Sequence, residues 1–176
     1  GGPPNELLTL GHAPTWSPNG SFIAFGSAPG KDGLYRMEPT YHTGKVRSMG
    51  ADAERIAMTP GSGSAFSLSD WSPDGTLLAS SSRDRTTRIW DRDGRCLRVL
   101  EGHALSVWDA RFSLDGKRIA SCSFDTTIRV YDVLGGELLG SLLGHTRQIS
   151  SIDWAPDGRL FSGSRDGTCR VWDVDR

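Results

Sequence analysis

Residues 121–132 read Ser-Cys-Ser-Phe-Asp-Thr-Thr-Ile-Arg-Val-Tyr-Asp, and close copies of this stretch stand at residues 80–91 and 162–173. The aromatic-aspartate pair that ends each copy therefore recurs at intervals of 41 residues. A second motif, from an aromatic residue to a glycine, stands at residues 71–75, 112–116 and 154–158, at intervals of 41 and 42 residues. Two motifs on one period indicate internal repeats, and a period of about 40–45 residues is typical of β-propeller blades.

The best-preserved unit, residues 102–143, contains four short runs rich in apolar residues, at 107–112, 118–123, 127–131 and 137–142. Asp115-Gly116 and Gly135-Gly136 fall between runs, as hairpin turns do. We therefore predict an all-β protein, a single domain over residues 1–176 built as a β-propeller of about four four-stranded antiparallel blades. The predicted blades are residues 11–60, with an insertion at 39–53, then 61–101, 102–143, and 144–176 together with an N-terminal strand at 6–10.

The two ends of the chain are related in sequence. The last unit stops after its third run, and residues 6–12 resemble residues 137–145, which contain the fourth run of the unit before. We expect residues 6–10 to pair beside residues 169–172 and to close a small ring, because closure removes exposed sheet edges. The alternative is a partial propeller, a fragment of a longer repeat protein that would self-associate through its open edges. The chain begins with Gly1 rather than Met.

Charge and composition narrow the classes of partner. The chain of 176 residues has 20 basic and 21 acidic side chains and a formal net charge of −1, with neither sign collected in a block. Nucleic acids and anionic membrane surfaces attract a basic excess, so neither is an expected partner. No apolar run approaches the roughly 18 residues that a membrane span requires.

Cysteine and histidine usage predicts neither disulfides nor a metal site. Cys96, Cys122 and Cys169 are odd in number and lack the Cys-x-x-Cys spacing, which favours a reducing cytoplasmic or nuclear compartment. His12 and His42 have no nearby cysteines that could complete a zinc site. We expect no metal and no cofactor.

Residues 61–176 resemble the WD40-repeat family in the Gly-His pair, the Ser-Pro-Asp-Gly-like turn, the serine-rich second run and the Asp-x-Thr-x-Arg-x-Trp-Asp stretch. The first unit is degenerate: residues 14–20, 23–25 and 34–37 look more like propellers of the Tol-translocation and prolyl-oligopeptidase type. Both resemblances imply propeller blades. The WD40 resemblance further implies a surface for binding other proteins.

Serine, histidine and aspartate recur together in a way that invites a hydrolase interpretation. The set appears twice at the same offsets and a third time in part, whereas a catalytic centre is normally unique. The WD40 resemblance implies structural hydrogen-bonded tetrads instead. Their members are His103, Ser121, Asp125 and Tyr131; His145, Ser162, Asp166 and Trp172; and, in part, Ser80, Asp84 and Trp90. We predict no catalytic residue and no enzymatic activity.

Four residues are candidates for partner binding. Arg83, Phe124 and Arg165 each stand just before the aspartate of the second-to-third-strand turn, a position that the WD40 resemblance places on the top face of the ring. Trp108 is the one tryptophan outside the periodic positions, where the other units have Ser67 and Ser150. Aromatic residues and arginine are enriched at interfaces. For Trp108 the alternative is packing against a neighbouring blade.

The function expected from these features is a non-catalytic scaffold that presents its top face to a protein or a peptide, including a phosphorylated or acidic segment. The alternative is an accessory propeller domain, or a fragment of a larger WD-repeat protein or enzyme, that gates or positions a substrate.

Overall fold

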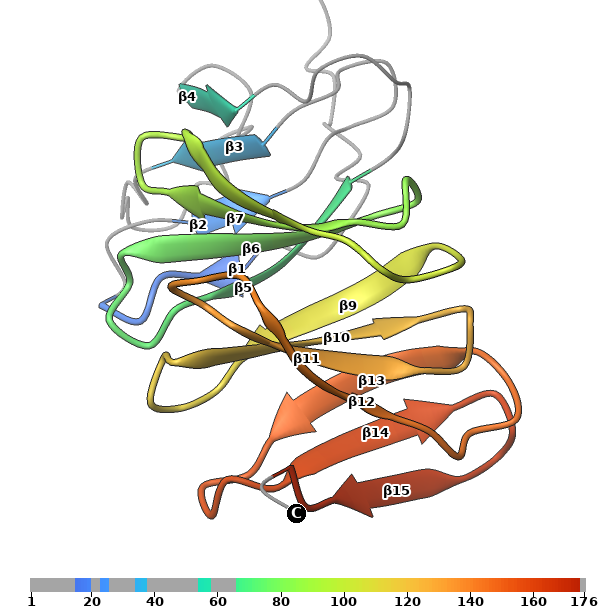
Figure 1. Cartoon of the computed structure of the whole chain (residues 1–176). Coiled ribbons are helices and arrows are strands. Elements are labelled where there is room, and N and C mark those ends of the chain that lie inside the picture. The colour runs from blue at the N-terminus through green and yellow to red at the C-terminus, as the bar shows by residue number, and fades with distance from the viewer. Residues whose placement is uncertain (1–14, 20–22, 26–33, 38–53, 58–65, 175–176) are drawn as a thin grey trace, which may run out of the picture.

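The computed structural model describes residues 15–19, 23–25, 34–37, 54–57 and 66–174, and these form strands and turns with no helix. Their strands make four antiparallel sheets (Figure 1). The first sheet contains β1 (Thr15–Trp16), β2 (Ile23–Phe25), β3 (Leu34–Met37) and β4 (Glu54–Ala57). The second contains β5 (Phe66–Trp71), β6 (Leu77–Ser82), β7 (Thr87–Asp91) and β8 (Cys96–Leu100). The third contains β9 (Val107–Phe112), β10 (Arg118–Ser123), β11 (Ile128–Asp132) and β12 (Leu138–Leu142). The fourth contains β13 (Ile149–Trp154), β14 (Leu160–Ser164) and β15 (Cys169–Trp172). The prediction of an all-β chain of antiparallel blades is confirmed.

The four sheets share one register. In each, the aromatic residue that ends the first strand pairs with an aliphatic residue of the second strand. The pairs are Trp16 with Ile23, Trp71 with Leu78, Phe112 with Ile119, and Trp154 with Leu160. The repeats seen in the sequence are therefore repeats of backbone structure, and equivalent residues occupy equivalent places in successive sheets.

The core lies between sheets rather than within one sheet. Each sheet is meandering, and its first strand contacts the first strand of the next sheet. One cluster joins the second and third sheets and contains Ala79, Ile89, Leu100, Ala110, Phe112, Ile119, Tyr131 and Val133. Another joins the third and fourth sheets and contains Ala120, Cys122, Ile128, Val130, Ile149, Ile152, Trp154 and Leu160. Each inner sheet thus buries both of its faces, one against the preceding sheet and one against the following sheet.

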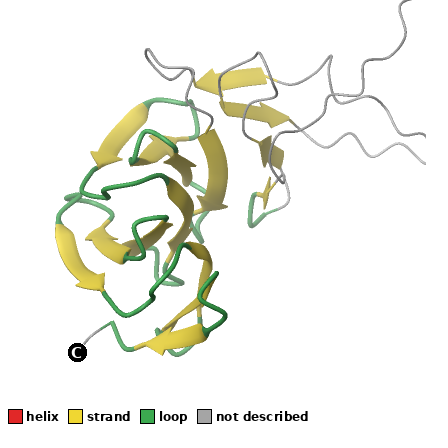
Figure 2. Ribbon diagram, turned by 90° about the vertical axis from the view of Figure 1, so that its right-hand side faces the viewer, coloured by secondary structure: helices red, strands yellow, loops and turns green. Residues whose placement is uncertain are grey.

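The described sheets follow one another along an open arc (Figures 1 and 2). In this part of the chain the first and fourth sheets do not meet, so the described residues form a partial propeller and not the closed ring that we expected as one alternative. The strand predicted at residues 6–10 and the insertion predicted at 39–53 lie outside the described residues, as do His12 and His42. The described part also holds no helix with the length and apolar character of a membrane span.

The turn between the second and third strands of a sheet has a left-handed residue after its aspartate. This residue is Arg85 (φ 75°), Thr126 (φ 73°) or Gly167 (φ 84°). Glycine adopts this conformation without strain, whereas a β-branched residue such as Thr126 does so at a cost. The turn is kept in all three sheets because side chains hold it, as described below.

Candidate interaction surface

Two kinds of loop meet along one edge of the sheets. One kind leads into the first strand of a sheet, and the other joins its second strand to its third. Backbone hydrogen bonds tie them together: Phe124 N donates to Ser106 O at 3.0 Å, and Arg165 N donates to Gln148 O at 2.9 Å. We call this edge the top face. It carries the turns at Arg83, Phe124 and Arg165 in three successive sheets.

A buried hydrogen-bond network fixes the top face of the third sheet. His103 contacts Asp125 Oδ2 through Nδ1 at 2.8 Å and Ser121 Oγ through Nε2 at 2.9 Å. Asp125 Oδ2 also accepts from Ala104 N at 2.9 Å, and its Oδ1 accepts from Thr127 Oγ1 at 2.7 Å. One carboxylate therefore holds the loop before the first strand and the turn after the second strand in one arrangement.

The fourth sheet repeats this network with the same geometry. His145 contacts Asp166 Oδ2 at 2.7 Å and Ser162 Oγ at 2.8 Å, and Thr146 N donates to Asp166 Oδ2 at 3.1 Å. The indole Nε1 of Trp172 donates to Ser162 Oγ at 2.8 Å, which brings all four members together. The ring of Trp172 also lies edge-on to the ring of His145, with 5.9 Å between centroids.

The other two sets differ in the residues that they bring together. In the second sheet Trp90 Nε1 donates to Ser80 Oγ at 2.9 Å, while Asp84 accepts from the turn that follows it. In the third sheet the phenol of Tyr131 donates to Glu101 O at 2.9 Å. The longer reach of a phenol carries this bond to the backbone before the Gly-His pair.

Burial sets the protonation of His103. It lowers the pKa of His103 below its ordinary value of 6.5, and this effect outweighs the neighbouring carboxylate of Asp125. Burial acts to raise the pKa of Asp125, but hydrogen bonds from Thr127 and His103 prevail and lower it. The pair at neutral pH is thus a neutral imidazole beside a carboxylate. Hydrogen bonds from Thr168 and His145 lower the pKa of Asp166 as well.

Trp108 and Phe124, which the sequence singles out separately, lie against each other. Their rings stack with 5.1 Å between centroids and 23° between planes. Trp108 sits at a β-bulge, because Val107 pairs with Ser123 and Asp109 pairs with Cys122, which leaves no partner position for Trp108. A bulge turns a side chain out of the regular alternation. The indole is 43% exposed, so the stack is open to solvent while Val107 beside it is buried.

Leu105 and the two arginines border this aromatic pair along the top face. Leu105 is 52% exposed, and its carbonyl accepts a hydrogen bond from Ser123 Oγ at 3.1 Å. Arg83 and Arg165 are exposed on the equivalent turns of the second and fourth sheets, and within the described residues neither guanidinium forms an ion pair. The structure brings Trp108 and Phe124 into contact and places the arginines in the flanking sheets.

Sequence reasoning missed a charged cluster on the first strands of the sheets. Arg111 Nε lies 3.3 Å from Asp109 Oδ2, and Arg111 Nη1 lies 3.9 Å from Asp70 Oδ1. Asp70 and Arg111 hold equivalent positions, each just before the aromatic residue that ends the first strand. Comparing the charged residues at this position from one repeat to the next would have identified the pair. No group of three histidine, cysteine or acidic residues suited to a metal ion occurs in the described part of the chain.

The repeats match the family described as "WD domain, G-beta repeat" at residues 53–91, 94–132 and 136–173. Each match begins with the outer strand of one sheet and ends with the third strand of the next: the first covers β4 to β7, the second β8 to β11 and the third β12 to β15. A repeat and a sheet are therefore offset by one strand. Three matched repeats account for the described strands except β1, β2 and β3.

Curated WD-repeat proteins resemble the same region. The chain is 39% identical over 105 residues to the F-box/WD repeat-containing protein sel-10 of Caenorhabditis elegans, covering 57% of this chain and 18% of that protein. It is 31% identical over 112 residues to the COMPASS component SWD3 of Saccharomyces cerevisiae, covering 62% and 36%. It is 36% identical over 104 residues to guanine nucleotide-binding protein subunit beta-5b of Danio rerio, covering 57% and 26%.

The matched region thus spans little more than a third of these relatives at most. The repeat period, the common register of the sheets, the Gly-His and aromatic-aspartate motifs, and the three matched repeats agree with one another. The chain belongs to the WD40-repeat family.

Proposed function

We propose that the chain is a non-catalytic scaffold that binds a protein or peptide segment on its top face, at the stacked pair of Trp108 and Phe124. The observation that carries the proposal is an exposed aromatic stack on a rim whose backbone is held by buried hydrogen bonds. The WD-repeat relatives support a role in protein interaction in general. The residues of the site are our own assignment.

Rigidity is the physical advantage of this surface. The loops that carry Phe124 and Leu105 are tied through Ser123 and Asp125, so binding has little backbone freedom to remove. Exposed aromatic side chains supply large contact area at low conformational cost. An apolar anchor of the partner would lie on Trp108 and Phe124.

The flanking arginines favour a partner with acidic groups. Arg83 and Arg165 lie on the sheets either side of the aromatic pair, and guanidinium groups pair well with carboxylates and phosphates. We therefore propose a segment that combines an aromatic or aliphatic anchor with acidic or phosphorylated residues.

A hydrolytic role does not suit the Ser-His-Asp sets. Ser121 is fully buried and Ser162 is almost fully buried, so a substrate carbonyl has no open approach to either hydroxyl. The sets also recur with one geometry in two sheets, which is the behaviour of architecture. We propose no cofactor, no membrane or nucleic-acid partner, and a cytoplasmic or nuclear location.

The second candidate is an accessory propeller domain of a larger WD-repeat protein or enzyme. The feature that favours it is the first sheet, whose strands β1 to β3 lie before the matched repeats and whose sequence resembles Tol-translocation and prolyl-oligopeptidase propellers. In that case the same top face would position a substrate for a catalytic domain.

A random-peptide display library, selected on the immobilised chain, tests the proposed site. Selected peptides should combine an apolar anchor with acidic residues, and they should lose at least tenfold in affinity for the double variant Trp108→Ala/Phe124→Ala. Arg83→Glu/Arg165→Glu should weaken binding in a salt-dependent way. The control is Leu139→Ala, an exposed residue of the outer strand β12. Peptides that bind the aromatic double variant as tightly as the unaltered chain would place the site elsewhere.

A further inference from the structure

The fold separates charges that are mixed along the sequence. Over residues 82–87, 101–106, 123–127, 143–148 and 164–168, the exposed ionisable side chains of the top face are four arginines and one glutamate, namely Arg83, Arg85, Arg147, Arg165 and Glu101. The aspartates of its turns are partly buried and already accept hydrogen bonds, as Asp125 does from Thr127. The top face is therefore positively charged.

The opposite ends of the sheets carry the turns between first and second strands and between third and fourth strands, and we call them the bottom face. In the second to fourth sheets the bottom face holds eight acidic and four basic residues, over 72–76, 91–95, 113–117, 132–137, 155–159 and 173–174. One of the bases, Arg159, pairs with Asp157 at 2.6 Å. A hydrogen bond from Ser113 lowers the pKa of Asp115, so this carboxylate is ionised at neutral pH. The bottom face is therefore negatively charged.

Two leucines lie among these charges, on the bottom turns of the third sheet. Leu134 is 81% exposed, the largest fraction among the large apolar side chains that the structure describes, and Leu114 is 58% exposed. Leu114 stands where the second and fourth sheets have Pro73 and Pro156. The turn of the second sheet equivalent to that of Leu134, residues 91–95, holds only charged residues and a glycine. Neither leucine belongs to the repeat pattern or to the core, so both are available to a partner.

The turn that carries Leu134 is held from the neighbouring sheet. The guanidinium of Arg98 in β8 donates to Leu134 O from Nε at 3.1 Å and from Nη2 at 2.6 Å. Val133 N donates to Lys117 O at 2.9 Å, which joins this turn to the turn that contains Leu114. Because the backbone is fixed before binding, docking of these leucines has little conformational freedom to remove.

The top face carries basic residues at the same positions as its apolar ones. Arg165 in the fourth sheet is the equivalent of Phe124 in the third. Arg147 is the equivalent of Leu105, since the carbonyl of each accepts a hydrogen bond at 3.1 Å from the serine that ends the second strand. The apolar surface of the third sheet thus continues as a basic surface on the fourth.

The bottom turn of the third sheet has the composition expected of a ligand for this surface. Residues 132–137 read Asp-Val-Leu-Gly-Gly-Glu, an aliphatic anchor between two acids. The top face offers the counterpart, the stacked rings of Trp108 and Phe124 with arginines beside them. Opposite charge around an apolar contact determines both the partner and its orientation.

We propose that the bottom face of one copy of this chain binds the top face of a second copy. Leu134 then lies on the rings of Trp108 and Phe124, and acids such as Glu137 face the arginines. The inference rests on the proposed function, because the receiving surface is the same top-face site. The contact joins unlike surfaces and leaves each pair with one free top and one free bottom, so further copies add in series.

Light scattering coupled to size exclusion, over a hundredfold range of protein concentration, tests the proposal on the full chain. The mean mass of the unaltered chain should rise above the 19.1 kDa of one chain as concentration increases, and it should fall again in high salt. Leu134→Lys should hold the mass at one chain, as should Trp108→Ala/Phe124→Ala. Both variants should retain the circular dichroism of a β-sheet protein.

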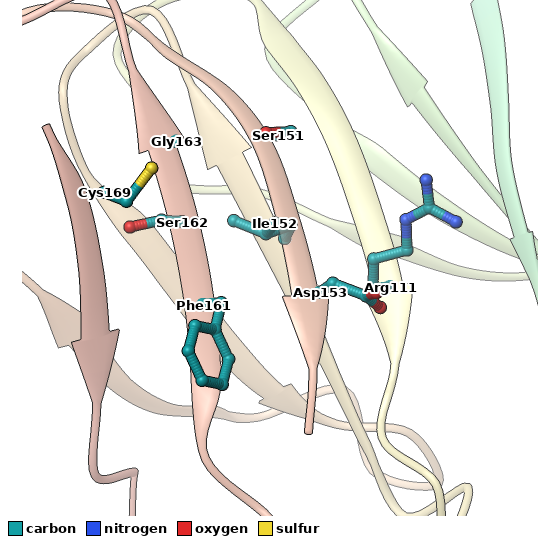
Figure 3. Close-up of a pocket in the computed structure, with 8 residues that line it drawn as sticks. All are labelled: Arg111, Ser151, Ile152, Asp153, Phe161, Ser162, Gly163 and Cys169. Atoms are coloured by element: carbon teal, nitrogen blue, oxygen red, sulfur yellow. The ribbon is translucent and has the colours of Figure 1, made fainter. Parts of the chain in front are cut away.

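Phe161→Lys is the matched control for Leu134→Lys. Phe161 is 40% exposed and lies beside a pocket of about 420 Å³ on β13–β15, none of whose lining residues belongs to the top or the bottom face (Figure 3). This variant makes the same chemical change at an exposed apolar residue, and it should associate like the unaltered chain. Association that is lost in Phe161→Lys but kept in Leu134→Lys would overturn the proposal.

Mixing the two interface variants gives a result that misfolding cannot imitate. Leu134→Lys keeps an intact top face, and Trp108→Ala/Phe124→Ala keeps an intact bottom face. An equimolar mixture should therefore form one-to-one dimers of twice 19.1 kDa and nothing larger. A mixture of folded variants that stays at one-chain mass, or an unaltered chain that does so at every concentration, would rule the contact out.

The peptides selected on the top face separate this inference from the proposed function. Added in excess, they should return the unaltered chain to one-chain mass, because they occupy the same site. Peptides that bind at Trp108 and Phe124 while the copies stay apart would overturn the self-association and leave the proposed function standing. The absence of both peptide binding and association would overturn both.

Discussion

The carboxylate of Asp70 in the second sheet accepts a hydrogen bond from the backbone N–H of Phe112 in the third sheet, at 3.0 Å. This bond joins neighbouring sheets at the ends of their first strands. In the same place, Arg111 Nη1 lies 3.9 Å from Asp70 Oδ1. Burial raises the pKa of Asp70 from 3.8 to about 6, against the opposing effects of Phe112 and Arg111. The contact between the two sheets therefore contains a carboxyl group, that of Asp70, whose ionised form is disfavoured in the folded chain.

The pKa of Asp70 predicts a pH dependence of stability. Between about pH 4 and pH 6 the folded chain retains a proton that the unfolded chain has released, so this group's contribution to the free energy of unfolding falls as pH rises and then levels off. The loss is of the order of 2 kcal/mol. Urea unfolding from pH 4 to pH 7 should show it as the difference between the unaltered chain and Asp70→Asn.

The comparison with Asp70→Asn isolates this group, because other carboxylates with lowered pKa values, such as Asp125, are common to both chains. The amide keeps an oxygen that accepts from Phe112 N and carries no charge. The stability of the variant relative to the unaltered chain should rise with pH through this window. A difference that stays flat from pH 4 to pH 7 would show that Asp70 titrates near its ordinary value in the fold.

His103→Ala should destabilise the chain by about 1–3 kcal/mol, because it removes the histidine partner of the buried Ser121 Oγ and one of the hydrogen bonds that hold Asp125 Oδ2. Chemical denaturation measures the loss, with Ser141→Ala on the exposed side of β12 as the control. A fluorophosphonate should leave Ser121 unlabelled in the folded chain. Stoichiometric labelling of that serine would instead identify a nucleophile.

Tyr131→Phe should cost about 1 kcal/mol, since it removes the hydrogen bond from the phenol to Glu101 O. Trp172→Phe should cost more, because it removes the indole donor to Ser162 and also leaves unfilled volume beside the core cluster between the third and fourth sheets. Thermal and denaturant unfolding of the two variants gives the comparison. Equal losses would mean that the two networks depend on their aromatic members to the same degree.

Thr126→Gly should stabilise the chain by about 0.5–1 kcal/mol, because it relieves a left-handed β-branched residue and loses only part of that gain to backbone entropy. Gly167 already has this role in the fourth sheet. The matched change Thr127→Gly should destabilise, since Thr127 donates to Asp125 Oδ1 at 2.7 Å. A loss of stability in Thr126→Gly would indicate that the turn is not strained at that position.

Strand positions could be predicted well where two motifs enclose a run. The predicted strands at 107–112 and 118–123 agree with β9 and β10. In these strands, turn residues mark both ends, and apolar residues recur at the interval of the repeat. The strand β4 was not predicted, because no turn motif marks the ends of Glu54–Ala57. Its pairing with β3 defines it as a strand.

The arrangement of the candidate site needed three-dimensional information. Trp108 stood out as an aromatic residue off the repeat period, but its contact with Phe124 depends on a bulge that shifts the register between Ser123 and Cys122. Local sequence does not reveal such a shift. The contact of Asp70 with the third sheet is likewise a property of how two sheets pack, which no single repeat encodes.

The offset of one strand between repeat and sheet has a consequence for how the chain emerges from the ribosome. The strands β5 to β7 of the first matched repeat obtain their fourth strand, β8, from the second repeat, and β9 to β11 obtain β12 from the third. During synthesis each sheet therefore keeps an unpaired outer edge until the start of the next repeat is available. Translation pauses at which residue 91 or residue 132 is the last to have left the ribosome should prolong the lifetime of these edges, whereas pauses at which residue 100 or residue 142 has left it should not.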